Sequence, residues 1–165
     1  MTAPRWALAL SFFGAMLVAP ALARDSLGIY GDWGAFRDAE PYRCYAIAEP
    51  AEARGGKWKP FVTLAWWPSD QVRGQFHVRL SRERRAAADV YLEAGGRKWR
   101  LAAGKYDAWS PSAAHDAFIF ARLRSARSFS VSSVSRNGGG FADTYRLNGA
   151  ASAFDAAALG CAKGR

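Results

Sequence analysis

The chain has 165 residues, 50% of them hydrophobic and 22% charged, with a formal net charge of +9. This length allows one domain with a substantial core, and the positive charge favours anionic partners, although it also serves solubility. Two histidines and two cysteines exclude a credible four-ligand metal site if the cysteines are oxidised, and the scattered acidic residues argue against a calcium loop.

Residues 1–23 have the pattern of a secretory signal peptide. One positive charge at Arg5 precedes an apolar run over residues 6–18, and the segment ends in a small-residue site at 21–23. The apolar run is shorter than the roughly 20 residues that a membrane span needs, and no later segment is long and apolar enough. We therefore expect an exported protein, periplasmic or at the cell surface, that begins at Arg24. A retained anchor helix is the alternative.

Export bears on the only two cysteines, Cys44 and Cys161. Two cysteines in an oxidising compartment usually pair, whereas in the cytosol they would be buried thiols. A Cys44–Cys161 disulfide would enclose almost the whole mature chain and would stabilise it by about 4–5 kcal/mol in the chain-entropy model.

Short strand-like segments recur about every ten residues, separated by Gly, Pro, Ser or Asp. We expect strands over residues 29–33, 42–48, 61–67 and 72–80, a turn over 37–41 and a loop over 50–59. In the fourth strand, Phe76, Val78 and Leu80 alternate with polar residues. One face of that strand therefore belongs to the core, and His77 lies on the solvent face.

The clearest hairpin joins residues 90–94 to 97–102 through Gly95-Gly96. A two-residue loop fixes the register. It pairs Leu92 with Trp99 and Val90 with Leu101 on the core face, and Glu93 with Lys98 and Tyr91 with Arg100 outside. A slip of one residue would bury Lys98 and expose Trp99, so the pattern specifies this register.

After a turn over residues 105–111, the periodicity changes to that of a helix over 113–126. Its apolar side carries Ile119, Phe120, Leu123 and Ala126, with Arg122 and Arg124 largely opposite. Strand pattern returns at 129–131 and at 141–147. A bulged loop with an odd number of residues at 138–140 would pair Val131 with Leu147 and Ser133 with Tyr145.

A short helix over residues 152–159 ends the chain. Ser152 and Asp155 form a start that resembles a capping box, and Gly160 fits a left-handed stop just before Cys161. Together these elements predict a mainly β (α+β) domain over residues 24–165. It would be an antiparallel β-sandwich or partly open barrel of about eight strands with two helices.

No nucleophile elbow, P-loop or dinucleotide-binding motif is present in the sequence. His115-Asp116 near Ser110 and Ser112 could suggest a triad, but adjacent residues at a helix start cannot easily point at one another. A polar first turn explains them better, with Asp116 favourable at the positive end of the helix. We expect no cofactor and no metal, and a hydrolase using two carboxylates that the fold brings together is the less favoured alternative.

The basic residues are unevenly distributed. The segment from Arg73 to Lys105 holds nine Lys and Arg against three acidic residues, and Ser81-Arg-Glu-Arg-Arg is its densest part. We expect a cationic patch that consists of Arg79, Arg82, Arg84, Arg85, Lys98 and Arg100. Such a patch could dock an anionic polymer or an acidic protein, or it could be a solvated face.

Six tryptophans follow the predicted signal peptide: Trp33, Trp58, Trp66, Trp67, Trp99 and Trp109. A small core can hold three or four of them. Trp66 and Trp67 cannot both point inward from one strand, so at least one of the two is a candidate contact residue or is covered by a loop.

These motifs resemble the invasion-associated locus B family of exported alphaproteobacterial envelope proteins. The resemblance rests on the signal peptide, Gly31-Asp32-Trp33, Arg43-Cys44-Tyr45, the amphipathic segment near Ile119 and the terminal Phe154-Asp155-Ala156-Ala157-Ala158-Leu159-Gly160-Cys161. It implies a periplasmic or surface β-rich protein, linked in some pathogens to host-cell entry, and it supplies no catalytic residues.

The leading hypothesis is a non-enzymatic envelope or surface protein that binds an anionic polymer or an acidic protein partner, without specific recognition of nucleic acid. An inhibitor or accessory subunit of another envelope protein is the alternative, which an exposed aromatic patch would favour. A deep pocket with two close carboxylates would favour the hydrolase.

Overall fold

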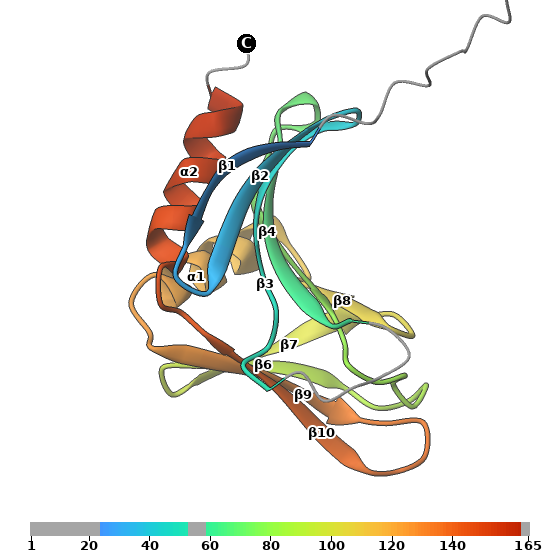
Figure 1. The fold of residues 1–165 in the computed structure, drawn as a ribbon. Helices are drawn as coiled ribbons and strands as arrows, with labels where there is room; N and C mark the ends of the chain where they lie inside the picture. The colour runs from blue at the N-terminus through green and yellow to red at the C-terminus, as the bar shows by residue number, and fades with distance from the viewer. Residues whose placement is uncertain (1–23, 53–58, 163–165) are drawn as a thin grey trace, which may run out of the picture.

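Ten antiparallel strands form one open, strongly bent sheet in residues 24–52 and 59–162, the part of the chain that the computed structural model describes (Figure 1). The strands are β1 (Arg24–Tyr30), β2 (Trp33–Ala39), β3 (Tyr42–Ala48), β4 (Phe61–Trp67), β5 (Val72–Arg79), β6 (Val90–Ala94), β7 (Arg97–Ala103), β8 (Asp107–Trp109), β9 (Ser128–Val134) and β10 (Gly140–Arg146). Their order is β1-β2-β3-β4-β5-β8-β7-β6-β9-β10. The mainly β class is confirmed, with two more strands than expected. The predicted signal peptide lies outside the described residues.

The first hairpin corrects the expected strand over residues 29–33. The chain turns at Gly31 and Asp32, with Gly31 at φ 56°, so that Tyr30 of β1 pairs with Trp33 of β2. The expected turn over 37–41 is also wrong, because β2 continues to Ala39. Arg37 and Asp38 extend it, since each forms an ion pair with a residue of a neighbouring strand.

The β6–β7 hairpin has the predicted register at every position. Leu92 pairs with Trp99, and Glu93 pairs with Lys98. The predicted turn over 105–111 instead contains β8, because Ala108 is fully buried in the core and pairs with Val78 of β5.

The β9–β10 loop has an odd number of residues, as expected, but it is longer and shifts the register. Val131 pairs with Asp143 and not with Leu147, and Ser133 pairs with Phe141 and not with Tyr145. The observed register places Tyr145 opposite Phe129, and their rings stack with centroids 4.8 Å apart. Both side chains are buried, which explains why this register is favoured.

Helix α1 (Ala113–Leu123) begins at the predicted residue and ends three residues before the predicted end. Helix α2 (Ala150–Ala162) begins before and ends after the predicted 152–159. Ser152 is therefore inside the helix and not its N-cap. Gly160 does not end it, and instead lets Leu27 of β1 pack closely, since a Cβ there would meet the Leu27 side chain.

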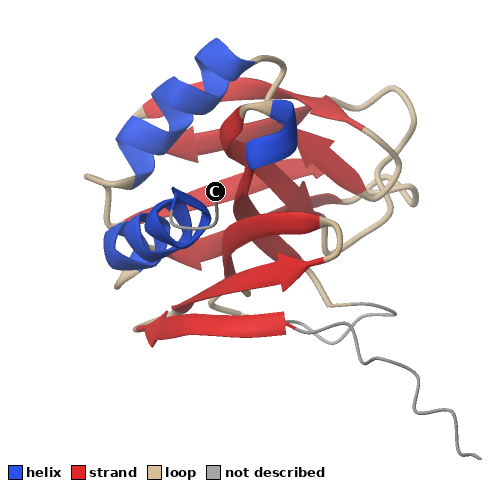
Figure 2. Cartoon of the chain, turned by 90° about the horizontal axis from the view of Figure 1, so that it is seen from above, coloured by secondary structure: helices blue, strands red, loops and turns tan. Residues whose placement is uncertain are grey.

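The core lies between the bent sheet and the two helices. Trp33 of β2 contacts Phe154 of α2 edge to face at 5.1 Å, and Phe120 of α1 contacts the same Phe154 at 5.6 Å. The two helices lie on the same side of the sheet (Figure 2). The bend brings β10 back to β2, where the Trp33 indole donates to the carbonyl of Arg146 at 2.9 Å.

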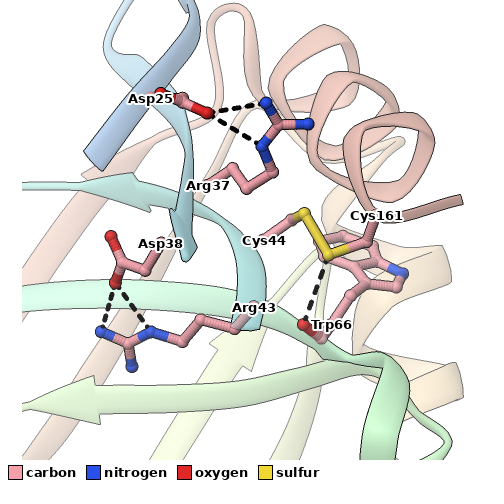
Figure 3. Close-up of a disulfide and its surroundings, with 7 residues drawn as sticks. All are labelled: Asp25, Arg37, Asp38, Arg43, Cys44, Trp66 and Cys161. Atoms are coloured by element: carbon pink, nitrogen blue, oxygen red, sulfur yellow. Dashed lines mark hydrogen bonds and ion pairs between the residues drawn. A yellow bond between two sulfur atoms is a disulfide. The ribbon is translucent and has the colours of Figure 1, made fainter. Parts of the chain in front are cut away.

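The predicted disulfide is present. Cys44 of β3 is bonded to Cys161 near the end of α2, with the Cα atoms 5.6 Å apart, beside buried Trp66 (Figure 3). The bond fastens the last turn of the terminal helix to a central strand.

Candidate binding surface

The outer face of the first strands carries alternating charged and aromatic side chains. Asp38 accepts from both Arg24 and Arg43, and these cations hold the pKa of its carboxyl below the usual value, although burial opposes the shift. The Arg43 guanidinium lies 4.9 Å from the ring centre of Tyr45 and 5.1 Å from that of Trp67. Trp67 is therefore half-buried under a cation, and Trp66 lies in the core.

His77 lies on the outer face, as predicted, but it is half-buried. Its ring stacks on Trp109 at 5.2 Å, and its Nε2 is 3.0 Å from a carboxylate oxygen of Asp107. Burial lowers the pKa of the imidazole, and Asp107 opposes this shift. Thr63 completes a Thr-His-Asp arrangement, with Oγ1 3.5 Å from Nδ1 of His77.

This arrangement lends little support to acyl transfer. Such chemistry needs free backbone donors aimed at an oxyanion, close to the nucleophile. Thr63 is in the middle of β4, which is paired with β3 on one side and β5 on the other at that position. The backbone around Thr63 is thus engaged in the sheet, and a structural role on the outer face accounts for the three side chains.

The polar residues at the start of α1 also have structural partners. The carboxylate of Asp116 is buried, accepts from the backbone N–H of Phe76 at 2.7 Å and accepts from the hydroxyl of Ser110. Ser112 caps the helix by accepting from the backbone N–H of His115. Asp116 therefore joins α1 to β5, in agreement with the polar-first-turn interpretation.

Arg84 of the predicted patch has its guanidinium directed into the protein. It donates to five backbone carbonyls, those of Arg85, Ala86, Ala88, Ala103 and Gly104, at 2.6–3.3 Å. These bonds hold the segment after β5 against the β7–β8 turn. Arg84 is a structural residue, and its charge is largely satisfied by these acceptors.

The remaining patch residues lie on different parts of the surface. Arg79 is 3.8 Å from Asp107 on the outer face, and Arg82 and Arg85 are exposed in the connection after β5. Lys98 lies over the ring of Tyr91 at 4.3 Å, and Arg100 forms an ion pair with Asp89 at 2.6 Å. The structure brings together only three of the patch residues around one hollow of about 780 Å³: Arg84, Lys98 and Arg100.

That hollow continues the space between α1 and β7. A second one, of about 490 Å³, is lined by Arg97 and Trp99 of β7 and by Phe118 and Arg122 of α1. Trp99 lines both hollows, and His115 and Pro111 border the first. We call this surface the α1–β7 groove and define it by Arg97, Lys98, Trp99, Arg100, Phe118 and Arg122.

The groove combines apolar and cationic groups. Phe118 is 66% exposed, and Trp99 is half-buried beside it. Within residues 24–52 and 59–162, the guanidinium groups of Arg97 and Arg122 have no acidic partner. An exposed aromatic ring that shares a hollow with these two guanidinium groups suits a partner with both apolar and acidic side chains.

The sequence interpretation did not include Arg97, Phe118 or Arg122 in the patch. A signal was present for each. Arg97 belongs to the same basic segment, and the predicted apolar side of the helix leaves Phe118 and Arg122 outside it. What the sequence could not supply is the tertiary arrangement that places side chains of α1 and β7 around one hollow and so makes one surface from two distant segments.

Comparisons of the chain with models of protein families, with curated proteins and with solved structures return no significant match. Among the described residues, no group of three or more His, Cys, Asp and Glu side chains could hold a metal ion. No described helix has both the length and the apolar character to cross a membrane.

Proposed function

We propose that this chain is a non-enzymatic, exported envelope or surface protein that binds an acidic partner through the α1–β7 groove. The Cys44–Cys161 disulfide supports an oxidising compartment, and the signal-like residues 1–23 support export to it. The resemblance to the invasion-associated locus B family supports an envelope location, periplasmic or at the cell surface.

One observation carries the proposal. Phe118 exposes 66% of its surface in a groove where Arg97 and Arg122 have no acidic partner among the described residues. An exposed large aromatic side chain is costly to leave in water, and interface cores are enriched in aromatic residues and arginine. The apolar share of the groove favours a protein partner over a purely anionic polymer. The same apolar share is also compatible with the alternative function, that of an inhibitor or accessory subunit of another envelope protein.

The test is capture of partners from envelope extract by the mature protein at low and physiological salt. The variant Arg97→Gln/Arg122→Gln removes the two arginines of the groove that have no acidic partner among the described residues. The control variant Arg73→Gln/Arg146→Gln removes two exposed arginines that also lack an acidic partner among the described residues, on other parts of the surface. Both variants have the same net charge, so a general charge effect would reduce capture equally.

We expect the groove variant to lose at least about tenfold in captured partner and the control variant to retain it within about twofold. Capture by wild type should also weaken as salt rises, because exposed charges are screened. Equal capture by both variants, or equal loss in both, would contradict the proposal.

A further inference from the structure

Among the described residues, the edge of β7 that faces the groove has no neighbouring strand over residues 97–101. The amide of Gly104 donates to the carbonyl of Asp107 at 2.7 Å, and Ala102 pairs with Trp109. Continued in the same register, β8 would place Pro111 opposite Arg100. Proline has no N–H to donate, and Ser112 immediately caps α1, so β8 ends there.

Because β8 ends, backbone groups of β7 lack hydrogen-bond partners within residues 24–52 and 59–162. Along an antiparallel strand, the N–H and C=O of every second residue point to the same side. Gly104 and Ala102 face β8, so Arg100 and Lys98 direct their backbone groups to that side too. Within the described part of the chain, β7 pairs at these two positions only with β6, on its other side.

We propose that the α1–β7 groove binds an extended segment of a protein partner, which adds to the free edge of β7 as an antiparallel strand. The inference rests on the proposed function and specifies its partner. Arg100 and Lys98 would each exchange two backbone hydrogen bonds with the added segment. Residues 97–101 offer an edge of about five residues, roughly 17 Å at the rise of an antiparallel strand.

The groove also sets the side-chain pattern of that segment. Side chains opposite Lys98 and Arg100 fall on the cationic outer face, where acidic residues fit. Side chains between them fall on the other face, toward Trp99 and Phe118, where apolar residues fit beside the guanidinium groups of Arg97 and Arg122. Asp89 already pairs with Arg100, so Lys98 is the stronger attraction on the outer face. The expected segment therefore alternates acidic with apolar residues.

A peptide edge accounts for the groove better than a lipid surface does. Two free N–H and two free C=O groups spaced along a strand match the backbone of another strand in register. A membrane surface offers phosphate acceptors for the N–H groups and the guanidinium groups, but no regular donors for the carbonyls. The aromatic side of the groove faces α1 and so is enclosed from that direction.

The test uses a fluorescent peptide with the core Asp-Leu-Asp-Leu-Asp and two backbone-methylated forms of it. Methyl groups on the amides of the second and third Asp residues remove two donors that would face β7. Methyl groups on the Leu amides modify donors that would face away, with the same charge and the same number of methyl groups. Binding to the mature protein is measured by fluorescence anisotropy, and protection of the amides of Lys98 and Arg100 by hydrogen exchange.

We expect Asp-amide methylation to weaken binding at least about tenfold and Leu-amide methylation to change it less than about threefold. The Lys98 and Arg100 amides should gain protection only with the peptides that bind. Equal binding by the two methylated forms, no binding by any form, or unchanged exchange at both amides would overturn strand addition.

A separate arm distinguishes this proposal from the proposed function. Binding of anionic phosphatidylglycerol vesicles is measured with wild type and with Arg97→Gln/Arg122→Gln. If the vesicles bind only wild type and no peptide binds, strand addition is overturned, but the groove is still a binding surface. If partner capture does not depend on Arg97 and Arg122, the proposed function fails whatever the peptide result.

Discussion

Arg84 lies in a basic segment of the sequence, but its role is structural. Its guanidinium donates to five backbone carbonyls, so removing it leaves several acceptors without a donor. We expect Arg84→Lys to lower the free energy of unfolding by about 2–3 kcal/mol. The exposed neighbour Arg85 is the control, and Arg85→Lys should change the free energy of unfolding by less than about 0.5 kcal/mol. Urea denaturation measures both, and equal stability of the two variants would refute the structural role.

His77 should make stability depend on pH. Burial lowers the pKa of its imidazole in the folded state, against the opposing effect of Asp107, while Arg79 and Arg43 add to the lowering. The unfolded chain therefore binds the proton more readily, so the contribution of His77 is present above its ordinary pKa of about 6.5 and is lost as pH falls below it.

Comparison of the two histidines tests this assignment. We expect the urea midpoint of wild type to fall between pH 7 and pH 5, and the fall to be smaller in His77→Gln. His115 is exposed at the start of α1, so His115→Gln should retain the wild-type dependence. Urea titrations at several pH values measure it. If the urea midpoint of His77→Gln changes with pH as much as that of wild type, the pH dependence belongs to other groups.

Among the elements, two glycines with positive φ allow the cost of backbone strain to be compared with the cost of a steric clash. Gly149 before α2 has φ 81°, and a Cβ there would overlap the carbonyl oxygen of Tyr30. Gly138 in the β9–β10 loop has φ 92°, and a Cβ there would meet nothing within 4 Å. We expect Gly138→Ala to cost about 1 kcal/mol and Gly149→Ala at least about 3 kcal/mol in thermal or urea unfolding. Equal costs would contradict the close approach of α2 to the first hairpin.

Elements with a strong local signal were predictable, and those defined by distant contacts were not. Gly95-Gly96 with alternating flanks gave the register of β6 and β7 residue by residue. For the β9–β10 loop, the sequence predicted only that the number of residues is odd. The register could not be predicted, because it depends on the stacking of Phe129 on Tyr145. β8 has three residues and carries little local signal, since its pairing with β5 depends on the burial of Ala108.

The candidate groove shows the same limit. The basic segment and an exposed face on α1 are visible in the sequence, but only the tertiary structure brings their side chains around one hollow. Other tertiary contacts direct the Arg84 guanidinium onto backbone carbonyls and place Arg43 over Trp67. The basic segment of the sequence therefore identified the region of the candidate site. It did not distinguish basic residues with a structural role from those available for binding.

At the scale of the molecule, the disulfide joins the second quarter of the chain to its end. Cys44 and Cys161 are 117 positions apart, and a loop of that length gives about 4–5 kcal/mol in the chain-entropy model. We expect Cys44→Ala/Cys161→Ala to lose about 4 kcal/mol of unfolding free energy, measured by urea denaturation against the oxidised wild type. A loss below about 1 kcal/mol would show that packing of α2 alone holds the terminus.

The proposed contact surface is the α1–β7 groove, and site-specific photo-crosslinking tests this directly. A benzoylphenylalanine replaces Phe118, which is 66% exposed in the groove, or Ile29, which is 69% exposed on β1. Each protein is irradiated with envelope extract, and the crosslinked partner is identified by mass spectrometry. We expect a discrete acidic partner to be crosslinked from position 118 and not from position 29. Crosslinking of that partner from position 29 alone would contradict it.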